Sequence, residues 1–247
     1  MSYGALSHLG ISAQQSFGTA TGSWDYMPII SESLVTEIEQ LEEEGMRARF
    51  EAGATHEGLI TIVGDIVFEP HPILMGHFLR GVTGQGSLSY SNSACVWEFI
   101  PKQGDFSTNC ALPPFTLQIY RDNGSAWQFT DAIVNQLGIE ISGGAMVKAT
   151  ASMLCRVSSL MTKTSPSFPA GNPYNWSQAS LSLAGAANGD FESFVFTINN
   201  NIEGITVLDN TRLHGKYLRA GYRESIFNGN MDFASQADFN KFRVGSE

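Results

Sequence analysis

The sequence predicts a mainly β fold built from antiparallel strands. Residues 59–69 and 137–157 alternate apolar and polar side chains with a period of two, which is the pattern of strands that bury one face. The composition agrees, because only 15% of the 247 residues are charged while 25 are glycine and 16 are phenylalanine, as expected of turns and aromatic packing. With 43% hydrophobic residues, the chain can bury a core, which excludes disorder of the whole.

The first strand is expected at residues 59–69. Its apolar and polar residues fall on opposite faces, as the geometry of a strand requires. The apolar face carries Ile60, Ile62, Ile66 and Phe68, and the polar face carries Thr61, Asp65 and Glu69. This pattern predicts a long strand with one side on the core and the other in water.

An antiparallel hairpin is expected at residues 137–157. The runs 137–141 and 146–157 each alternate, and Ser142, Gly143 and Gly144 between them favour a turn. The polar face of the hairpin carries Glu140, Lys148, Thr150 and Ser152. We expect these four side chains to face water.

Weaker patterns predict the remaining elements. Five further strands are expected at residues 97–100, 115–120, 179–183, 194–198 and 219–233. A helix is expected at 72–82, because Pro72 suits a first helical turn and apolar residues follow at spacings of three and four. A second, short helix is expected at 236–242.

Residues 31–44 fit two structures. Leu34, Ile38 and Leu41 lie at helical spacing behind a serine that suits a helix cap, yet Ile30, Leu34 and Ile38 also share one face of a strand. Periodicity alone favours the helix slightly.

Two segments lack periodicity but carry large aromatic side chains. They are residues 1–27, rich in serine, glycine and alanine, and residues 160–177, which contain three prolines. Their aromatic residues include Trp24, Tyr26, Phe168, Tyr174 and Trp176. Because such side chains bury wide apolar areas against a partner surface, we expect them to make contacts between subunits.

We therefore divide the chain into an N-terminal arm, residues 1–27, and a β domain, residues 28–247, with an extended loop at 160–177. A faint internal repeat relates residues 64–78 to residues 229–242, since each reads as a strand that runs into a helix. This repeat is compatible with an ancient duplication within the chain, but it does not establish one.

The charge balance restricts the classes of partner. The 14 Lys and Arg against 24 Asp and Glu give a formal charge of −10, whereas tight binding of nucleic acid needs clustered cations. DNA as a passing cargo stays compatible with this balance. The acidic residues at 37–44 form either a solvated face or a surface that repels another polyanion.

No catalytic, metal-binding or membrane-spanning pattern stands out. His71 and His77 are six residues apart, which does not put both on one helical face, and Cys95, Cys110 and Cys155 form no CxxC pair, so buried free thiols are expected. No apolar run reaches the roughly 18 residues of a spanning helix. We expect a soluble, non-enzymatic protein without cofactor, metal or membrane anchor that is made in a cytoplasm.

The order of several motifs resembles the tail tube proteins of tailed bacteriophages. The motifs lie between about residues 20 and 243, so the resemblance covers nearly the whole chain. They are Trp24-Asp-Tyr-Met-Pro-Ile-Ile-Ser-Glu-Ser-Leu34, His56-Glu-Gly-Leu-Ile-Thr-Ile-Val-Gly-Asp-Ile66, Ile133-Val-Asn-Gln-Leu-Gly-Ile-Glu-Ile141, Gly143-Gly-Ala-Met-Val-Lys-Ala149, Phe196-Thr-Ile-Asn-Asn-Asn-Ile-Glu203 and Gly229-Asn-Met-Asp-Phe233. In that family residues 29–38 form a strand.

The resemblance implies an antiparallel β-sandwich or β-barrel with one flanking helix and a short C-terminal helix. It also implies that the protein joins copies of itself into stacked rings, of six subunits or of three doubled ones, around a β-lined channel. DNA would be a transient cargo, other tail proteins such as the tape measure and the terminator would be partners, and the virion tail tube would be the location. In such a tube the polar face with Glu140, Lys148, Thr150 and Ser152 is expected to line a negative channel.

Two other classes of function compete with this reading. An acidic β-sandwich that binds carbohydrate or protein would present its tryptophans, Trp24, Trp97, Trp127 and Trp176, on one concave face. An enzyme with an unrecognised site would need perturbed acids in a pocket. Electron microscopy of the concentrated protein separates tubes or rings from small particles.

Overall fold

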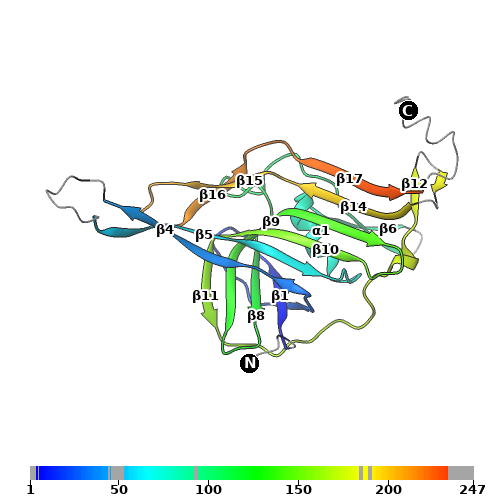
Figure 1. Cartoon of the computed structure of the whole chain (residues 1–247), viewed down its shortest axis with the longest axis horizontal. Helices are drawn as coiled ribbons and strands as arrows, with labels where there is room; N and C mark the ends of the chain where they lie inside the picture. The colour runs from blue at the N-terminus through cyan, green and yellow to red at the C-terminus, as the bar shows by residue number, and fades with distance from the viewer. Residues whose placement is uncertain are drawn as a thin grey trace.

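The computed structural model describes residues 4, 6–43, 45, 53–91, 94–183, 186–188 and 191–232. Within these ranges the protein is mainly β, and eleven strands form one continuous antiparallel sheet. The sheet curls into a half-barrel with an upper and a lower group of strands (Figure 1). Three separate two-stranded hairpins, one α-helix and one turn of 3-10 helix complete the regular structure of the described residues.

Both groups share the central strand β9 (Ala126–Ser142). The lower group is, in spatial order, β2 (Asp25–Met27), β1 (His8–Ala13), β8 (Phe115–Tyr120), β9 and β11 (Val157–Met161). The upper group is β17 (Glu224–Met231), β14 (Phe191–Asn199), β9, β10 (Lys148–Cys155), β5 (Thr55–Phe68) and an outer strand in two pieces, β3 (Ser31–Glu32) and β4 (Val35–Glu42). Three separate hairpins join β6 (Ser87–Ser91) to β7 (Ala94–Glu98), β12 (Leu181–Leu183) to β13 (Ala186–Asn188), and β15 (Ile202–Thr206) to β16 (His214–Arg219).

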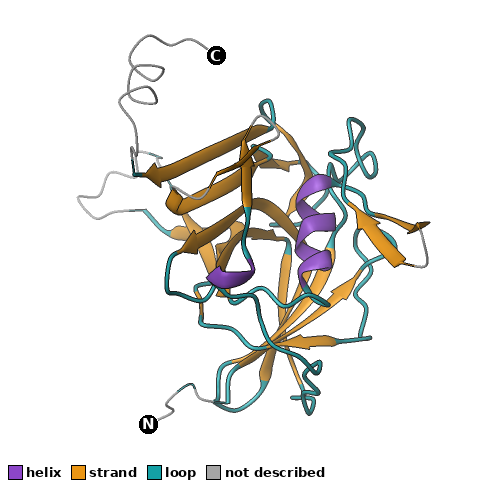
Figure 2. Cartoon of the chain, turned by 90° about the vertical axis from the view of Figure 1, so that its right-hand side faces the viewer, coloured by secondary structure: helices purple, strands orange, loops and turns teal. Residues whose placement is uncertain are grey.

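The helix α1 (Met75–Thr83) packs on the inner face of the sheet. Figure 2 shows it beside the upper group of strands. The rings of Phe78 and Phe68 lie 4.4 Å apart. At Gly81 the helix touches β9, since a Cβ there would lie 2.7 Å from Cγ2 of Val134, so a larger residue would push the helix off the sheet.

The main core joins the two groups of strands to α1. Its buried residues include Leu9, Ile11, Leu117, Phe129, Ile62, Ile66, Leu137, Met153 and Val82. Cys110 and Cys155 are buried free thiols, as the sequence predicted, and burial raises the pKa of the Cys110 thiol to about 12. The side chain of Cys95 lies outside the described part of the chain.

The hairpin that contains β9, β10 and β11 bends at one level, between the upper and lower groups. β10 pairs with β9 as far as Ile133, and β11 resumes the pairing at Thr130. Asp131 lies at the bend with φ 56°, a left-handed conformation that aspartate adopts more readily than most residues. Arg156 lies opposite, in the gap between β10 and β11.

The side chain of Asp131 anchors the N-terminal segment to this bend. The carboxylate is fully buried; its Oδ1 accepts a hydrogen bond from the Gly18 N–H at 2.7 Å, and its Oδ2 lies 3.7 Å from Nη1 of Arg156. The backbone N–H of Asp131 donates to Oε1 of Gln14 at 3.2 Å. Burial raises the pKa of the Asp131 carboxyl in spite of these partners.

A β-bulge at Asn135 connects β9 to the helix α1 and to the start of β17. The pairing of β9 with β10 shifts by one residue there, and the freed carbonyl of Asn135 accepts a hydrogen bond from the Asn200 N–H at 2.9 Å. The buried Asn200 side chain donates to the Val82 carbonyl of α1 at 2.9 Å and accepts from Nε of Arg223 at 2.7 Å. Asn200 therefore ties the helix, the bulge and the start of β17 together.

The main sequence predictions are confirmed with shifted bounds. β5 and the antiparallel pair β9 and β10 form as expected, and the helix begins at Met75 because residues 72–74 form turns. The weaker strands correspond to β7, β8, β12 and β14. The expected strand at 219–233 corresponds to β17, which begins at Glu224 because a bend follows Arg219, the last residue of β16; Phe233 lies outside the described residues. The short helix expected at 236–242 lies outside the described residues.

Two expectations were wrong. The described part of the segment 31–44, residues 31–43, is not helical: β3 and β4 pair with β5, as the family resemblance implied for residues 29–38. β4 is exposed on both faces, so the spacing of its apolar residues does not reveal whether the segment is a helix or a strand. Its pairing with β5 determines that it is a strand. The N-terminal arm, residues 1–27, also contains regular structure, namely β1 and β2. β1 is buried on both faces between β2 and β8, so its sequence shows no alternation of apolar and polar residues.

We expect Asp131→Asn to change how stability depends on pH. A carboxyl whose pKa is raised in the folded state stabilises that state fully below the unfolded pKa, and this contribution is lost as pH rises through the folded pKa. Asparagine keeps the acceptor for Gly18 and tolerates the left-handed backbone without titrating. Urea denaturation of unassembled protein between pH 4 and 7 measures the free energy of unfolding of both proteins. As pH rises, this free energy should increase in the variant relative to the wild type. A difference between the two that does not change with pH would contradict the raised pKa of Asp131.

We expect Asn200→Ala to lower the free energy of unfolding by about 2–4 kcal/mol, because it leaves a buried carbonyl and a guanidinium nitrogen without their partner. The exposed Asn230 offers a matched control, and Asn230→Ala should change stability by less than about 0.5 kcal/mol. Chemical denaturation measures both variants. Equal effects would show that the contacts of Asn200 contribute nothing special.

Candidate channel surface and assembly interfaces

The outward surface of the upper group, called here the polar face, consists of three rungs of side chains that cross its strands. Residues directly opposite in antiparallel strands lie on the same face of a sheet. The first rung is Lys148, Glu140, Val195 and Asn228; the second is Ser31, Val67, Thr150, Gly138, Thr197 and Ile226; the third is Asp65, Ser152, Gln136, Asn199 and Glu224. The rungs make one continuous surface opposite the core.

The four residues expected to line a channel all lie on the polar face. Glu140 and Lys148 are direct cross-strand partners and are exposed, whereas Thr150 and Ser152 are half-buried. The Ser152 hydroxyl donates a hydrogen bond to Oδ1 of Asp65 at 2.5 Å. The structure therefore brings the four residues together and adds a fifth polar partner from β5.

The polar face is mostly polar with a small negative excess. Its three rungs hold three carboxylates, Asp65, Glu140 and Glu224, against one cation, Lys148, so their net charge is −2. The sequence pattern predicts Asp65 and Glu140 on the polar sides of separate strands. It does not predict Glu224 on this face, because only the pairing of β17 with β14 brings that residue there.

The upper group ends in two strands that each have one neighbour among the described residues. β17 pairs with β14, and β4 pairs with β5; each is eight residues long. Both expose apolar side chains, with Ile226 45% and Phe227 43% exposed on β17 and Val35 53% and Leu41 49% exposed on β4. Long, exposed edges of this kind are templates for pairing with another chain.

The loop at 160–177 presents aromatic side chains to solvent. Phe168, Tyr174 and Trp176 are exposed by 48%, 39% and 49%. The end of the loop is fixed to the sheet, since the Tyr174 N–H donates to the Pro70 carbonyl at 3.0 Å and the Trp176 N–H to the Ala145 carbonyl at 3.1 Å. These aromatic residues are held in place without being covered.

Trp24 and Tyr26 of segment 1–27 are more enclosed. Tyr26 is only 8% exposed, and its hydroxyl is hydrogen bonded to that of Thr164. Trp24 lies over Gly10 of β1, where a Cβ would be 3.2 Å from the indole ring. Both side chains thus contribute to the subunit itself, and they leave less area for a neighbouring chain than the loop at 160–177 does.

The histidines singled out from the sequence do not form one site. His77 pairs with Asp25 at 2.8 Å, whereas His71 is buried and accepts a hydrogen bond from the Ile73 N–H at 3.3 Å. Among the described residues, no three His, Cys, Asp or Glu side chains are grouped to hold a metal ion. In the same part of the chain, no helix is long and apolar enough to cross a bilayer.

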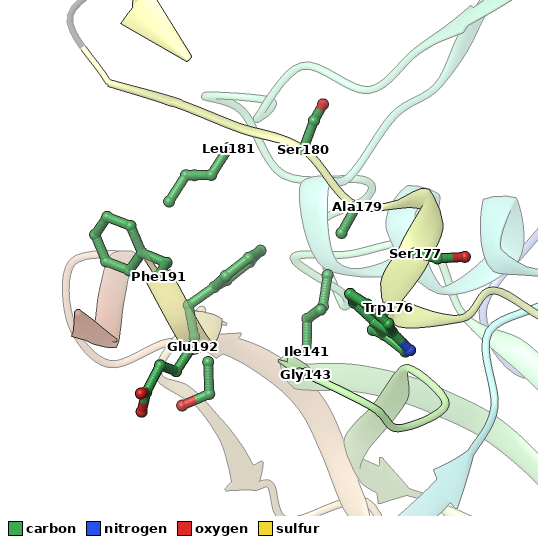
Figure 3. A pocket seen from close by; sticks show the side chains of 11 residues that line it. Ile141, Gly143, Trp176, Ser177, Ala179, Ser180, Leu181, Phe191 and Glu192 are labelled. Carbon is green, nitrogen blue, oxygen red and sulfur yellow. The ribbon is translucent and has the colours of Figure 1, made fainter. Parts of the chain in front are cut away.

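Two of the four tryptophans, Trp127 and Trp176, do not share the platform that a carbohydrate-binding surface needs. Trp127 lies near the beginning of β9 and packs against the main core. Trp176 lies beside Ile141 (Figure 3), near the opposite end of the same strand. Trp127 and Trp176 therefore do not belong to one concave row of aromatic side chains.

Comparison with known proteins agrees with this architecture. The family model described as phage tail tube protein matches residues 4–245, and no curated protein matches the chain. The match covers the half-barrel, the helix, the polar face and both edge strands. The family is structural rather than enzymatic, and its members lie in the tail tube of the virion. The chain belongs to the phage tail tube protein family and is a structural component of the tail tube.

Proposed function

We propose that copies of this chain close into rings, that the rings stack into a tube, and that the polar face lines the channel through which DNA leaves the virion. The observation that supports this most is that the polar rungs cross the upper group from β17 to β10, β5 or β3, and that the strands at the two ends of this group, β17 and β4, each have an exposed edge. Joining such edges between copies would continue the rungs around a ring.

Each ring closes by pairing β17 of one subunit with the β4 edge of the next. The two strands are of equal length and lie at opposite ends of the upper group, so the contact is heterologous and repeats around an axis. A ring of six copies is favoured over three doubled ones, because the described residues contain one curled sheet and one polar face.

The channel wall repels DNA weakly. The net charge of −2 on the three rungs of each subunit keeps phosphate groups hydrated, while serine, threonine, asparagine and glutamine offer no fixed cations for counterion release. The duplex therefore slides without sticking. Other tail proteins, such as a tape measure inside the tube and a terminator at its end, would meet the same channel and the outermost ring.

The aromatic residues of the two long segments contribute to contacts between subunits. Phe168, Tyr174 and Trp176 supply most of the exposed aromatic area, and Trp24 and Tyr26 support them from the N-terminal arm, residues 1–27. The rest of the chain, residues 28–247, forms the tube domain. Buried aromatic side chains dominate the energetics of many protein interfaces.

The edge contact is tested by lysine substitutions, because lysine on an edge strand blocks pairing with another chain. We expect Ile226→Lys and Leu41→Lys to fold normally, since both side chains are exposed, but to abolish long tubes in negative-stain electron microscopy. Ile73→Lys is the matched control, because Ile73 is 64% exposed and precedes α1, away from both edges. If the edge variants form as many long tubes as the control, the proposal is wrong.

The channel charge is tested by Glu140→Lys, which brings the net charge of the three rungs from −2 to zero. Each added cation supplies a phosphate contact, so we expect normal tubes but slower genome ejection from virions that carry the variant, with a stronger effect at low salt. Glu203→Lys on β15, outside the polar face, is the control. Equal ejection rates for both variants would place Glu140 away from the DNA path.

A further inference from the structure

Three basic side chains and one carboxylate lie together near the turn between β16 and β17. Nε of Arg219 lies 3.5 Å from Oδ1 of Asp105, and Nζ of Lys102 donates a hydrogen bond to the backbone carbonyl of Asp105 at 3.4 Å. Nη2 of Arg223 donates to the carbonyl of Lys102 at 3.3 Å. Lys102, Arg219 and Arg223 are called here the basic cluster. With Asp105, three positive charges and one negative charge give a net +2 in a chain whose net charge is −10.

The guanidinium of Arg219 lacks acceptors. Its Nε and Nη2 atoms are buried and have no hydrogen-bond partner in the described part of the chain, because the Asp105 oxygen at 3.5 Å is too distant for a good hydrogen bond. Burial lowers the pKa of the neighbouring Arg223 guanidinium, and the charge of Arg219 lowers it further. A second carboxylate beside Arg219 would supply both the missing acceptors and the missing negative charge.

The acids closest in sequence to the basic cluster are directed away from it. Glu224 follows Arg223 directly, but its side chain belongs to the polar face, whereas Arg223 reaches the buried Asn200. Glu203 on β15 lies opposite Leu218. Because successive residues of a strand point to opposite faces, Glu203 and Arg219 lie on different faces of that hairpin.

A second copy of the chain carries carboxylates that fit the basic cluster. β4 exposes Glu37, Glu39 and Glu42; the ion pairs of this hairpin involve other residues, and these three glutamates form none with a described residue. Figure 1 shows β4 and the adjoining part of β5 reaching out from the body of the subunit, so another copy can contact them. The tail tube family implies self-assembly, and copies of charge −10 repel one another unless opposite charges meet where they touch.

We propose that the basic cluster of one subunit binds the carboxylates of β4 from a second copy. Arg219 is the main donor, because Nε and Nη2 together can hold a carboxylate through two hydrogen bonds. Lys102 and Arg223 add positive charge around it. The contact rests on the self-assembly of the chain but not on the strand pairing of the proposed ring, since it uses side chains alone.

Carbodiimide cross-linking of assembled tubes tests the contact, because this reagent joins an amine directly to a carboxylate that touches it. Tubes are grown from an equal mixture of nitrogen-15-labelled and unlabelled full chains, and linked peptides are identified by mass spectrometry. We expect links from Lys102 to glutamates of β4 that combine one labelled and one unlabelled peptide. Lys216 is the control and should give no such link, because it lies on the face of β16 opposite to Arg219.

Assembly measured by sedimentation gives an independent outcome. Arg219→Gln should raise the concentration at which tubes form roughly fivefold or more at low salt, and the difference from the wild type should vanish at about 1 M salt, where charges are screened. Lys216→Gln removes the same charge from β16 and should assemble like the wild type.

The outcomes separate this contact from the proposed ring. Tubes without links between Lys102 and β4, or equal assembly of the two glutamine variants, would refute the contact and leave the ring standing. Links that join only peptides of the same label would place the contact within one subunit and would also overturn it. Failure of the wild type to form tubes at all would contradict both the ring and the contact.

Discussion

The fold depends on the buried contact between Asp131 and Arg156 at the bend of the central hairpin. Here β9 passes from the lower group of strands to the upper one, while its partner changes from β11 to β10. Burying a carboxylate is costly unless it is paired and hydrogen bonded. The Gly18 N–H and the guanidinium of Arg156 offset part of that cost, although burial still raises the pKa of the carboxyl. Arg156 also donates to the His214 carbonyl at 2.9 Å and lies over the ring of Phe17. The bend at Asp131 and Arg156 therefore connects both groups of strands to the N-terminal segment and to β16.

The bend also determines which surfaces are left for assembly. Because the lower group and α1 cover the inner face of the upper group, its other face is free to carry polar residues in register across as many as six strands. The same arrangement leaves β17 and β4 as open edges at opposite ends. A structural protein of a tube needs these two properties together: a smooth polar wall for the cargo and edges that continue the wall into the next copy. No residue of the described part of the chain has to act as a catalyst for either.

Much of the polar face could be predicted from the sequence, because period-two alternation identifies a half-buried strand without knowledge of its partners. Glu140, Lys148, Thr150 and Ser152 were found in this way. The register between distant segments could not be predicted: it brings Asp65 against Ser152 and carries Glu224 to the same face. β1 was missed because a strand buried on both faces has no polar alternation, and β4 was misread because it is exposed on both. The role of Asp131 gave no local signal, since Gly18 and Arg156 lie far from it in the sequence.

The central claim is that the polar face of the upper group lines a channel closed by strand pairing between copies. The most direct measurement is a cryo-electron microscopy reconstruction of tubes assembled from the purified chain, at a resolution that separates strands. The account predicts that Glu140, Lys148, Thr150 and Ser152 point toward the tube axis and that β17 of each subunit is hydrogen bonded to β4 of the next. A reconstruction with these side chains on the outer wall, or with the two edges unpaired, would contradict it.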